Sequence, residues 1–156
     1  MAGSNEGYKI SFHSLYPSAW FTRRKLLKKF IAKKLASEGK HIGQLNIIFC
    51  SDEYLLGINN QYLKHDDYTD IITFNLEPKS TQLYGDIYIS IPRVLENSSL
   101  FENPRSQELH RVIFHGILHL CGYNDKKLPH KAEMTRMENK WLKRYREYVS
   151  REIRST

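Results

Sequence analysis

Two histidines and one aspartate occur close together in the segment His-Gly-Ile-Leu-His-Leu-Cys-Gly-Tyr-Asn-Asp, which spans residues 115–125. If this segment begins on a helix, His115 and His119 lie one turn apart on the same face and could share one metal ion. Gly122 would let the chain turn just past the helix end, and Asp125 could then supply a third ligand. Two imidazoles and one carboxylate would leave the fourth position to water, as in catalytic zinc sites.

A simpler interpretation makes each histidine a core residue whose ring is satisfied by its neighbours. We favour the metal site because the helix is apolar nearly all round, and two imidazoles in such a helix need polar partners. His110 lies off the metal-facing stripe and is expected to be structural. His130 is the alternative third ligand if Asp125 does not reach the pair. Cys121 points away from His115 on a helical wheel and is not expected to bind the metal.

Residues 115–125 resemble the H-G-x-L-H-L-x-G-Y-x-H signature of the YbeY family of endoribonucleases, the rRNA maturation factors. The matching positions are His115, Gly116, Leu118, His119, Leu120, Gly122 and Tyr123. The family usually has a third His where this chain has Asp125, a change that bears on metal preference more than on the presence of a site. With this substitution, the resemblance implies one Zn²⁺ ion held by His115, His119 and Asp125.

A second segment, residues 60–74, resembles the family signature N-x-x-Y-R-x-K-D-x-P-T-D-V-L-S-F in part. The agreeing positions are Asn60, Tyr62, Asp66, Thr69, Asp70 and Phe74. Leu63 stands where the family has a functional Arg, whose charge would stabilise a transferring phosphate. Lys64 or His65 could supply that charge as a catalytic residue, or either could be an exposed loop residue.

The composition fits a single globular domain over residues 1–156, with residues 1–7 expected to be disordered. Hydrophobic residues make up 40% of the chain, which argues against disorder elsewhere. The sequence has no apolar run of membrane-spanning length and no signal-peptide pattern, so we expect a cytoplasmic protein. In that reducing compartment, Cys50 and Cys121 are expected to be buried thiols.

Positive charge is concentrated at the two ends of the chain. Residues 1–45 carry nine Lys or Arg against two acids, residues 46–108 four against ten, and residues 109–156 eleven against five. One helix face is especially basic, with Arg23, Arg24, Lys25, Lys28, Lys29 and Lys33. Such a face could contact RNA phosphates or could simply be solvated.

Hydrophobic periodicity predicts a strand, a helix, a strand, a helix, two strands and two helices. The first half is expected to contain a strand around 8–12, a helix from a Ser18 cap to Gly39, a strand at 45–50 and a helix from Ser51 or Asp52 to about Leu63. Strands at 71–76 and 84–91 and a helical turn at 92–97 follow. The chain then continues with a central helix from Pro104 to Cys121, a basic turn at 126–129 and a last helix. This order favours an α+β fold: a small mixed sheet packed against helices, in a zincin-like arrangement with the metal on the central helix.

The family resemblance implies a metal-dependent, single-strand-specific endoribonuclease that acts in rRNA maturation and ribosome quality control. The ion would polarise a phosphoryl oxygen or lower the pKa of a bound water. The implied partners are rRNA precursors and the small ribosomal subunit or its proteins, with no membrane and no DNA. One alternative is a ribosome-associated RNA-binding protein with a structural metal. A small zinc metalloprotease is less favoured, because its motif has Glu after the first His and this chain has Gly116.

Overall fold

The computed structural model describes residues 9–63 and 69–155 of the chain. Its strands are β1 (Ile10–Ser14), β2 (His41–Cys50), β3 (Ile71–Asn75) and β4 (Gln82–Ser90). Its helices are α1 (Arg24–Ser37), α2 (Asp52–Leu63), α3 (Ile91–Leu100), α4 (Arg105–Leu120) and α5 (Leu128–Arg154). This is the expected α+β class, with the elements in the expected chain order.

The strands form one mixed sheet in the order β1-β2-β4-β3. β1 and β4 both run parallel to β2, whereas β3 pairs antiparallel with β4 and forms an edge of the sheet. Helix α1 lies in the crossover from β1 to β2, because parallel neighbours require a long connection. Helix α2 lies in the connection from β2 to β3, which run in opposite directions. The short β3–β4 connection makes a hairpin.

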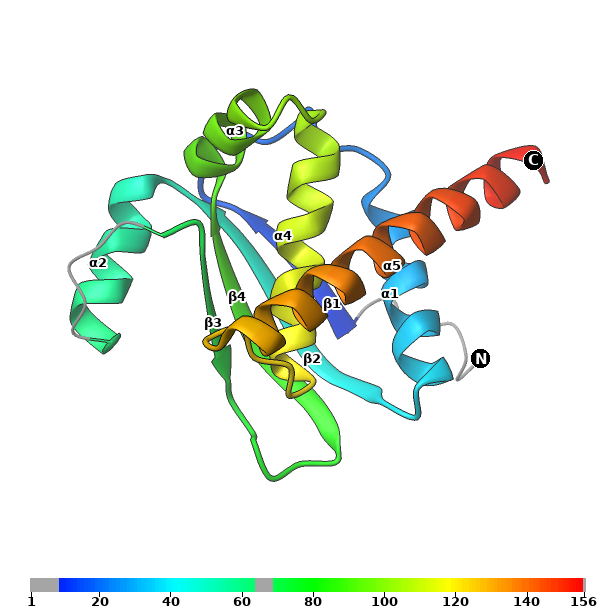
Figure 1. The fold of residues 1–156 in the computed structure, drawn as a ribbon, viewed down its shortest axis with the longest axis horizontal. Helices are drawn as coiled ribbons and strands as arrows, with labels where there is room; N and C mark the ends of the chain where they lie inside the picture. Colours follow the sequence, from blue (N-terminus) through cyan, green and yellow to red (C-terminus); the bar gives the residue numbers. More distant parts are fainter. Residues whose placement is uncertain (1–8, 64–68, 156) are drawn as a thin grey trace.

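The two faces of the sheet are covered unequally, as Figure 1 shows: α2 lies on one side, and α1, α4 and α5 lie on the other. The main core fills the side of the three helices, where Ile87 and Ile89 of β4 are fully buried. Because side chains alternate along a strand, Tyr88 points to the opposite face and packs against a smaller cluster with Leu55 and Ile58 of α2.

Helix α4 is the centre of the larger core, since most of its residues between Leu109 and Leu120 are buried. It packs directly on β3 and β4 at Gly116. A Cβ at this position would lie 2.9 Å from the Ile71 Cδ1 atom, 3.0 Å from the Ile87 Cγ2 atom and 3.2 Å from the Thr73 Cγ2 atom. The missing side chain of Gly116 therefore allows the close approach of helix and sheet that places α4 beside strand β3.

The prediction that Ser18 caps the first helix was wrong, because α1 begins at Arg24. The Ser18 hydroxyl contacts Ser14 Oγ at 3.0 Å and accepts a hydrogen bond from Arg24. Residues 18–21 instead make a turn that buries Phe21, and Arg23 takes a left-handed φ of 59° that no residue within an α-helix adopts.

Other observed boundaries also differ from the predicted ones. β2 begins at His41 and β4 at Gln82, because pairing between these two strands extends through polar residues that their apolar runs did not mark. The helical turn expected at 92–97 is the full helix α3, whose first turn is capped by the Ser90 hydroxyl accepting from the Arg93 backbone N–H. Leu128 and Pro129, expected in a turn, start α5, where proline suits the first helical turn.

Within the described residues, no helix combines the length and the apolar composition that crossing a membrane requires.

Candidate metal centre

His115 and His119 lie on one flank of α4, as their spacing predicts. Their ring centroids are 4.6 Å apart and their ring planes are nearly perpendicular, at 78°. Both side chains are partly exposed, at 21% and 28%. The pair is therefore accessible to a substrate while it is held by a buried helix.

The turn after α4 returns the chain toward these histidines. Gly122 has a φ of 103°, which is strained for any residue with a side chain. Its N–H donates to the His119 carbonyl at 3.0 Å, and the N–H of Tyr123 donates to the Leu118 carbonyl at 3.1 Å. This pair of bonds is the Schellman arrangement that ends a helix and reverses the chain, and it brings Asp125 back over α4.

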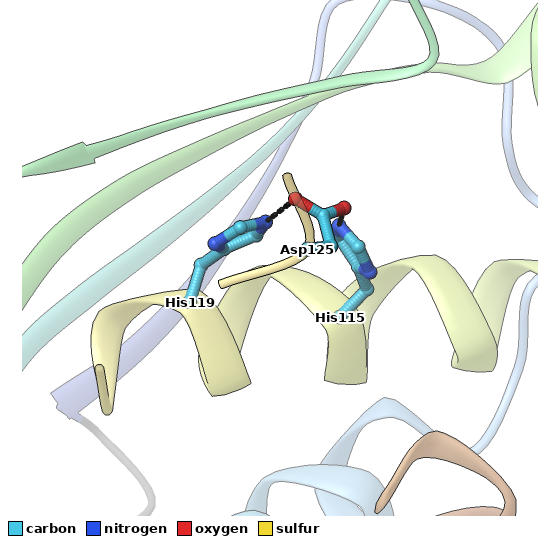
Figure 2. A group of neighbouring side chains, drawn as sticks. All are labelled: His115, His119 and Asp125. Atoms are coloured by element: carbon cyan, nitrogen blue, oxygen red, sulfur yellow. Dashed lines mark ion pairs between the residues drawn. The ribbon is translucent and has the colours of Figure 1, made fainter. Parts of the chain in front are cut away.

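Asp125 lies between the two imidazoles, as Figure 2 shows. Its Oδ2 atom is 3.4 Å from Nε2 of His115, and its Oδ1 atom is 3.5 Å from Nε2 of His119. These separations exceed the ~2.7–2.9 Å of a strong charge-assisted hydrogen bond. They are close to the roughly 3.3 Å between ligand atoms that each lie about 2.0 Å from a tetrahedral zinc ion.

The ligand atoms of His115, His119 and Asp125 all lie within 4.8 Å of one another, so the group could hold a divalent metal ion. Two imidazole nitrogens and one carboxylate oxygen are a donor set that zinc accepts. Among residues 9–63 and 69–155, this is the only group of three or more His, Cys, Asp or Glu that meets the same distance condition.

A second carboxylate, from α5, fixes the orientation of the first histidine. Glu138 is 7% exposed, and its Oε2 atom lies 2.6 Å from Nδ1 of His115. Arg111 donates from Nη1 to the other carboxylate oxygen at 3.0 Å. With Nδ1–H donating to Glu138, the lone pair of His115 Nε2 faces Asp125 and is free for a metal.

The surroundings shift the pKa values of the two histidines in opposite directions. Burial lowers the pKa of His115, but the hydrogen bond and charge of Glu138, with the charges of Asp125 and Asp70, outweigh it and raise the pKa above the ordinary value. Burial and the charge of His115 lower the pKa of His119. When only one of the two imidazoles is protonated, the proton is therefore favoured on His115. A metal ion that binds His115 must displace this proton.

Asp70, at the start of β3, adds a further acidic group near the histidines. Burial raises the pKa of its carboxyl group above the ordinary value, and the nearby charge of His115 partly opposes this shift. Its backbone carbonyl accepts from Ser90 and fixes the start of the strand. The side of α4 that carries His115 and His119 is therefore near several carboxyl groups, which favours a cation in the site.

Several other predicted residues can now be placed. His110 packs against the rings of Phe21 and Tyr145, at centroid distances of 5.2 and 4.8 Å, and is structural as expected. His130 is exposed in the first turn of α5 and is not part of the group. Leu63 ends α2 with 44% exposure. Lys64 and His65, the predicted catalytic residues, lie outside the described residues, and their roles stay a prediction.

Sequence reasoning missed Glu138. The signal was present, because Glu138 interrupts the apolar stripe of the last helix between Met137 and Trp141. A carboxylate at a core position of an amphipathic helix needs a buried partner. Nothing in the sequence alone identified that partner as His115, which lies 23 positions earlier on another helix.

The fold and the site define an α+β protein in which two histidines of the central helix and one carboxylate from the turn after it could hold a metal ion. Residues 16–146 match the family model described as Endoribonuclease YbeY, and the chain belongs to the YbeY family.

Curated relatives with the name Endoribonuclease YbeY cover most of the chain. The protein of Porphyromonas gingivalis is 41% identical over 145 residues, which are 93% of this chain and 95% of that protein. The protein of Phocaeicola vulgatus is 47% identical over 120 residues, which are 77% and 86% of the two chains. The solution structure of TM1509 from Thermotoga maritima aligns with a TM-score of 0.58 and 30% identity over 92% of each chain. The predicted family and fold class are thereby confirmed.

Proposed function

We propose that this chain is a metal-dependent endoribonuclease that cleaves single-stranded RNA during rRNA maturation. The observation that carries the proposal is the convergence of His115, His119 and Asp125 on one point at the end of α4, in a member of a family whose relatives are named endoribonucleases. A cytoplasmic location and an association with the small ribosomal subunit, both predicted from the sequence, fit this function.

We assign the three side chains as ligands of one zinc ion. A divalent ion bound there would polarise a phosphoryl oxygen of the scissile phosphodiester and make a nearby water more acidic. His115 and His119 would hold the ion through Nε2, and Glu138, 2.6 Å from Nδ1 of His115, would keep that ring in the required tautomer. Asp125 adds a negative charge that a third imidazole would not, which makes harder ions such as manganese more competitive.

The basic ends of the chain would supply the contacts to RNA phosphates. Helices α1 and α5 pack against each other, with the Phe30 ring 5.1 Å from the Tyr145 ring. Their exposed cations therefore belong to neighbouring surfaces: Lys25, Lys29 and Lys33 from α1, with Arg23 just before it, and Lys143, Arg144, Arg146 and Arg151 from α5. Arg24 was predicted to belong to the basic strip that could contact phosphates. Its guanidinium instead donates hydrogen bonds to the carbonyls of Ser18 and Phe21.

The metalloprotease alternative finds no support in the site. Gly116 carries no carboxylate, and a side chain there would meet Ile71 and Ile87 of the sheet. An RNA-binding protein with a structural metal remains a second candidate, favoured by one observation. Leu63 is exposed at the end of α2 and offers no charge where the family signature has Arg.

A cleavage assay separates the two candidates. Purified protein is incubated with a labelled single-stranded RNA and with the matched duplex, with and without a chelator. We expect cuts within the single strand that the chelator and His119→Ala both abolish, while His130→Ala, an exposed histidine outside the group, cleaves like the parent. Binding of the RNA without any cleavage by the metal-loaded parent would favour the structural-metal candidate instead.

A further inference from the structure

The sheet carries a hollow on the face turned away from α4. It lies between α2 and the strands β3 and β4 and has a cavity volume of about 560 Å³. We call it the aromatic groove and define it by the residues Tyr54, Tyr62, Phe74, Tyr88, Glu53 and Asp86. A hollow of this size is large enough for a small ligand or for part of a polymer.

The aromatic rings of this groove form a connected series. Tyr54 and Tyr88 are nearly parallel, at 27°, with centroids 6.4 Å apart. Phe74 contacts both Tyr88 and Tyr62 edge to face, at 6.0 Å in each case. Tyr54 is nevertheless 48% exposed and Tyr62 is 62% exposed. Aromatic rings gathered in a hollow with so much exposed surface mark a place where a flat ligand can stack.

The charge of the groove indicates which part of a nucleic acid would enter. Its described lining includes the carboxylates of Glu53 and Asp86 and no Lys or Arg, so a phosphate would be repelled. Asp86 accepts a hydrogen bond from Asn46 at 2.9 Å, and its carboxylate oxygens can accept further hydrogen bonds. Carboxylates can accept from the amino groups of bases, and aromatic side chains stack on unpaired bases in proteins that recognise single-stranded RNA.

Strand β3 has the groove on one face and helix α4, which carries His115 and His119, on the other. Phe74 points into the groove, while the preceding residue, Thr73, points to the other face and packs against Gly116, the neighbour of His115. A single strand could therefore pass around this edge, with bases in the groove and a phosphate near the histidines. The exposed aromatic side chains and the metal ligands lie on the two sides of one strand.

We propose that the aromatic groove is a nucleobase-binding subsite for the single-stranded RNA substrate, which holds bases flanking the phosphate that reaches His115 and His119. This inference rests on the proposed function and adds the part of the substrate that is recognised. Duplex RNA is excluded from the subsite because its bases are paired and stacked on one another, so their faces are not available.

The test compares RNA binding by two double variants and a matched control. Tyr54→Ala with Tyr62→Ala removes two rings, Tyr54→Phe with Tyr62→Phe keeps them, and Phe101→Ala removes a ring that is 60% exposed in the turn after α3. Affinities are measured by fluorescence anisotropy with a labelled single-stranded RNA and with an abasic strand of the same length, in chelator so that no cleavage occurs. Thermal unfolding checks that each variant is folded.

We expect the alanine pair to bind the RNA about 10- to 100-fold more weakly, because stacking contributes substantially for each base. The phenylalanine pair and Phe101→Ala should bind within about threefold of the parent, and the abasic strand should bind the parent and the alanine pair equally weakly. Equal RNA affinity of parent and folded alanine pair would overturn the subsite and leave the groove to another partner, such as a basic protein segment.

The outcome is distinguishable from failure of the proposed function. With metal present, the alanine pair should raise KM and leave kcat unchanged, since the rings contact substrate away from the reacting phosphate. If the parent bound RNA through the rings but never cleaved it, the endoribonuclease proposal would fail and the subsite would stand. If the parent cleaved RNA and the alanine pair had the parent's KM, the subsite alone would fail.

Discussion

Replacing Glu138 by Gln should weaken metal binding although Glu138 is not itself a ligand. The substitution keeps the size of the side chain and removes its charge. Its Oε2 atom lies 2.6 Å from Nδ1 of His115 in a position that is 7% exposed, so the charge-assisted hydrogen bond is little screened by water. A Gln oxygen can still accept from Nδ1–H, but it makes the imidazole a poorer donor to the metal.

Carboxylates that orient metal-binding histidines typically account for about 10- to 100-fold in metal affinity. We expect about a 10-fold loss, or roughly 1.4 kcal/mol, for Glu138→Gln and a loss nearer 100-fold for Glu138→Ala. Arg111 stays paired in either variant, because its Nη2 atom donates to Asn139 at 2.7 Å. The loss should therefore reflect His115 more than an unpaired guanidinium.

Metal affinity of these variants is measured by competition with a chromophoric zinc chelator. Glu133→Gln is the matched control, since Glu133 lies on the same helix, is 48% exposed and forms an ion pair with Arg136 away from the histidines. Zinc affinity of Glu138→Gln within twofold of the parent, with a normal unfolding temperature, would refute the role of this carboxylate in orienting His115.

Three further predictions concern the third ligand, the buried histidine and the helix–sheet contact. Asp125→Ala should lose most of the metal affinity, and Asp125→His should shift preference from manganese toward zinc in competition titrations. Burial lowers the pKa of His110 to about 4. Between pH 6.5 and about 4, His110 is therefore protonated in the unfolded chain and neutral in the folded chain. Stability should therefore fall by at most roughly 3 kcal/mol as the pH drops from 6.5 to 4, and His110→Phe should flatten this dependence in chemical unfolding. Gly116→Ala should lower the unfolding free energy by about 1 kcal/mol, because crowding of Ile87 and Thr73 outweighs the better helix propensity; a stabilised variant would contradict the close contact.

The arrangement of His115, His119 and Asp125 was predictable from the sequence because its geometry is local. The spacing of His115 and His119 fixes their common face on any α-helix, and Gly122 marks the turn that returns Asp125. The Schellman bonds at Gly122 and Tyr123 are the physical form of that signal. No long-range contact was needed to predict this part of the site.

The parts that sequence reasoning missed depend on contacts between distant segments. The pairing of Glu138 with His115 requires the crossing of α4 and α5, which no local pattern specifies. The start of α1 was misplaced because Ser18 has a common capping side chain, whereas its hydroxyl is used by Ser14 and Arg24 in the fold. The aromatic groove combines rings from α2, β3 and β4, whose spacing in sequence carries no sign of their proximity.

The account depends most on one metal ion that is both bound by the histidine pair and required for RNA cleavage. The most direct measurement titrates metal-stripped protein with zinc while bound zinc and the initial rate of cleavage of a single-stranded RNA are followed together. We predict that both rise and level off at one equivalent, and that His115→Ala with His119→Ala shows neither. Full cleavage by the stripped parent, or one equivalent of tightly bound zinc in the double variant, would contradict the account.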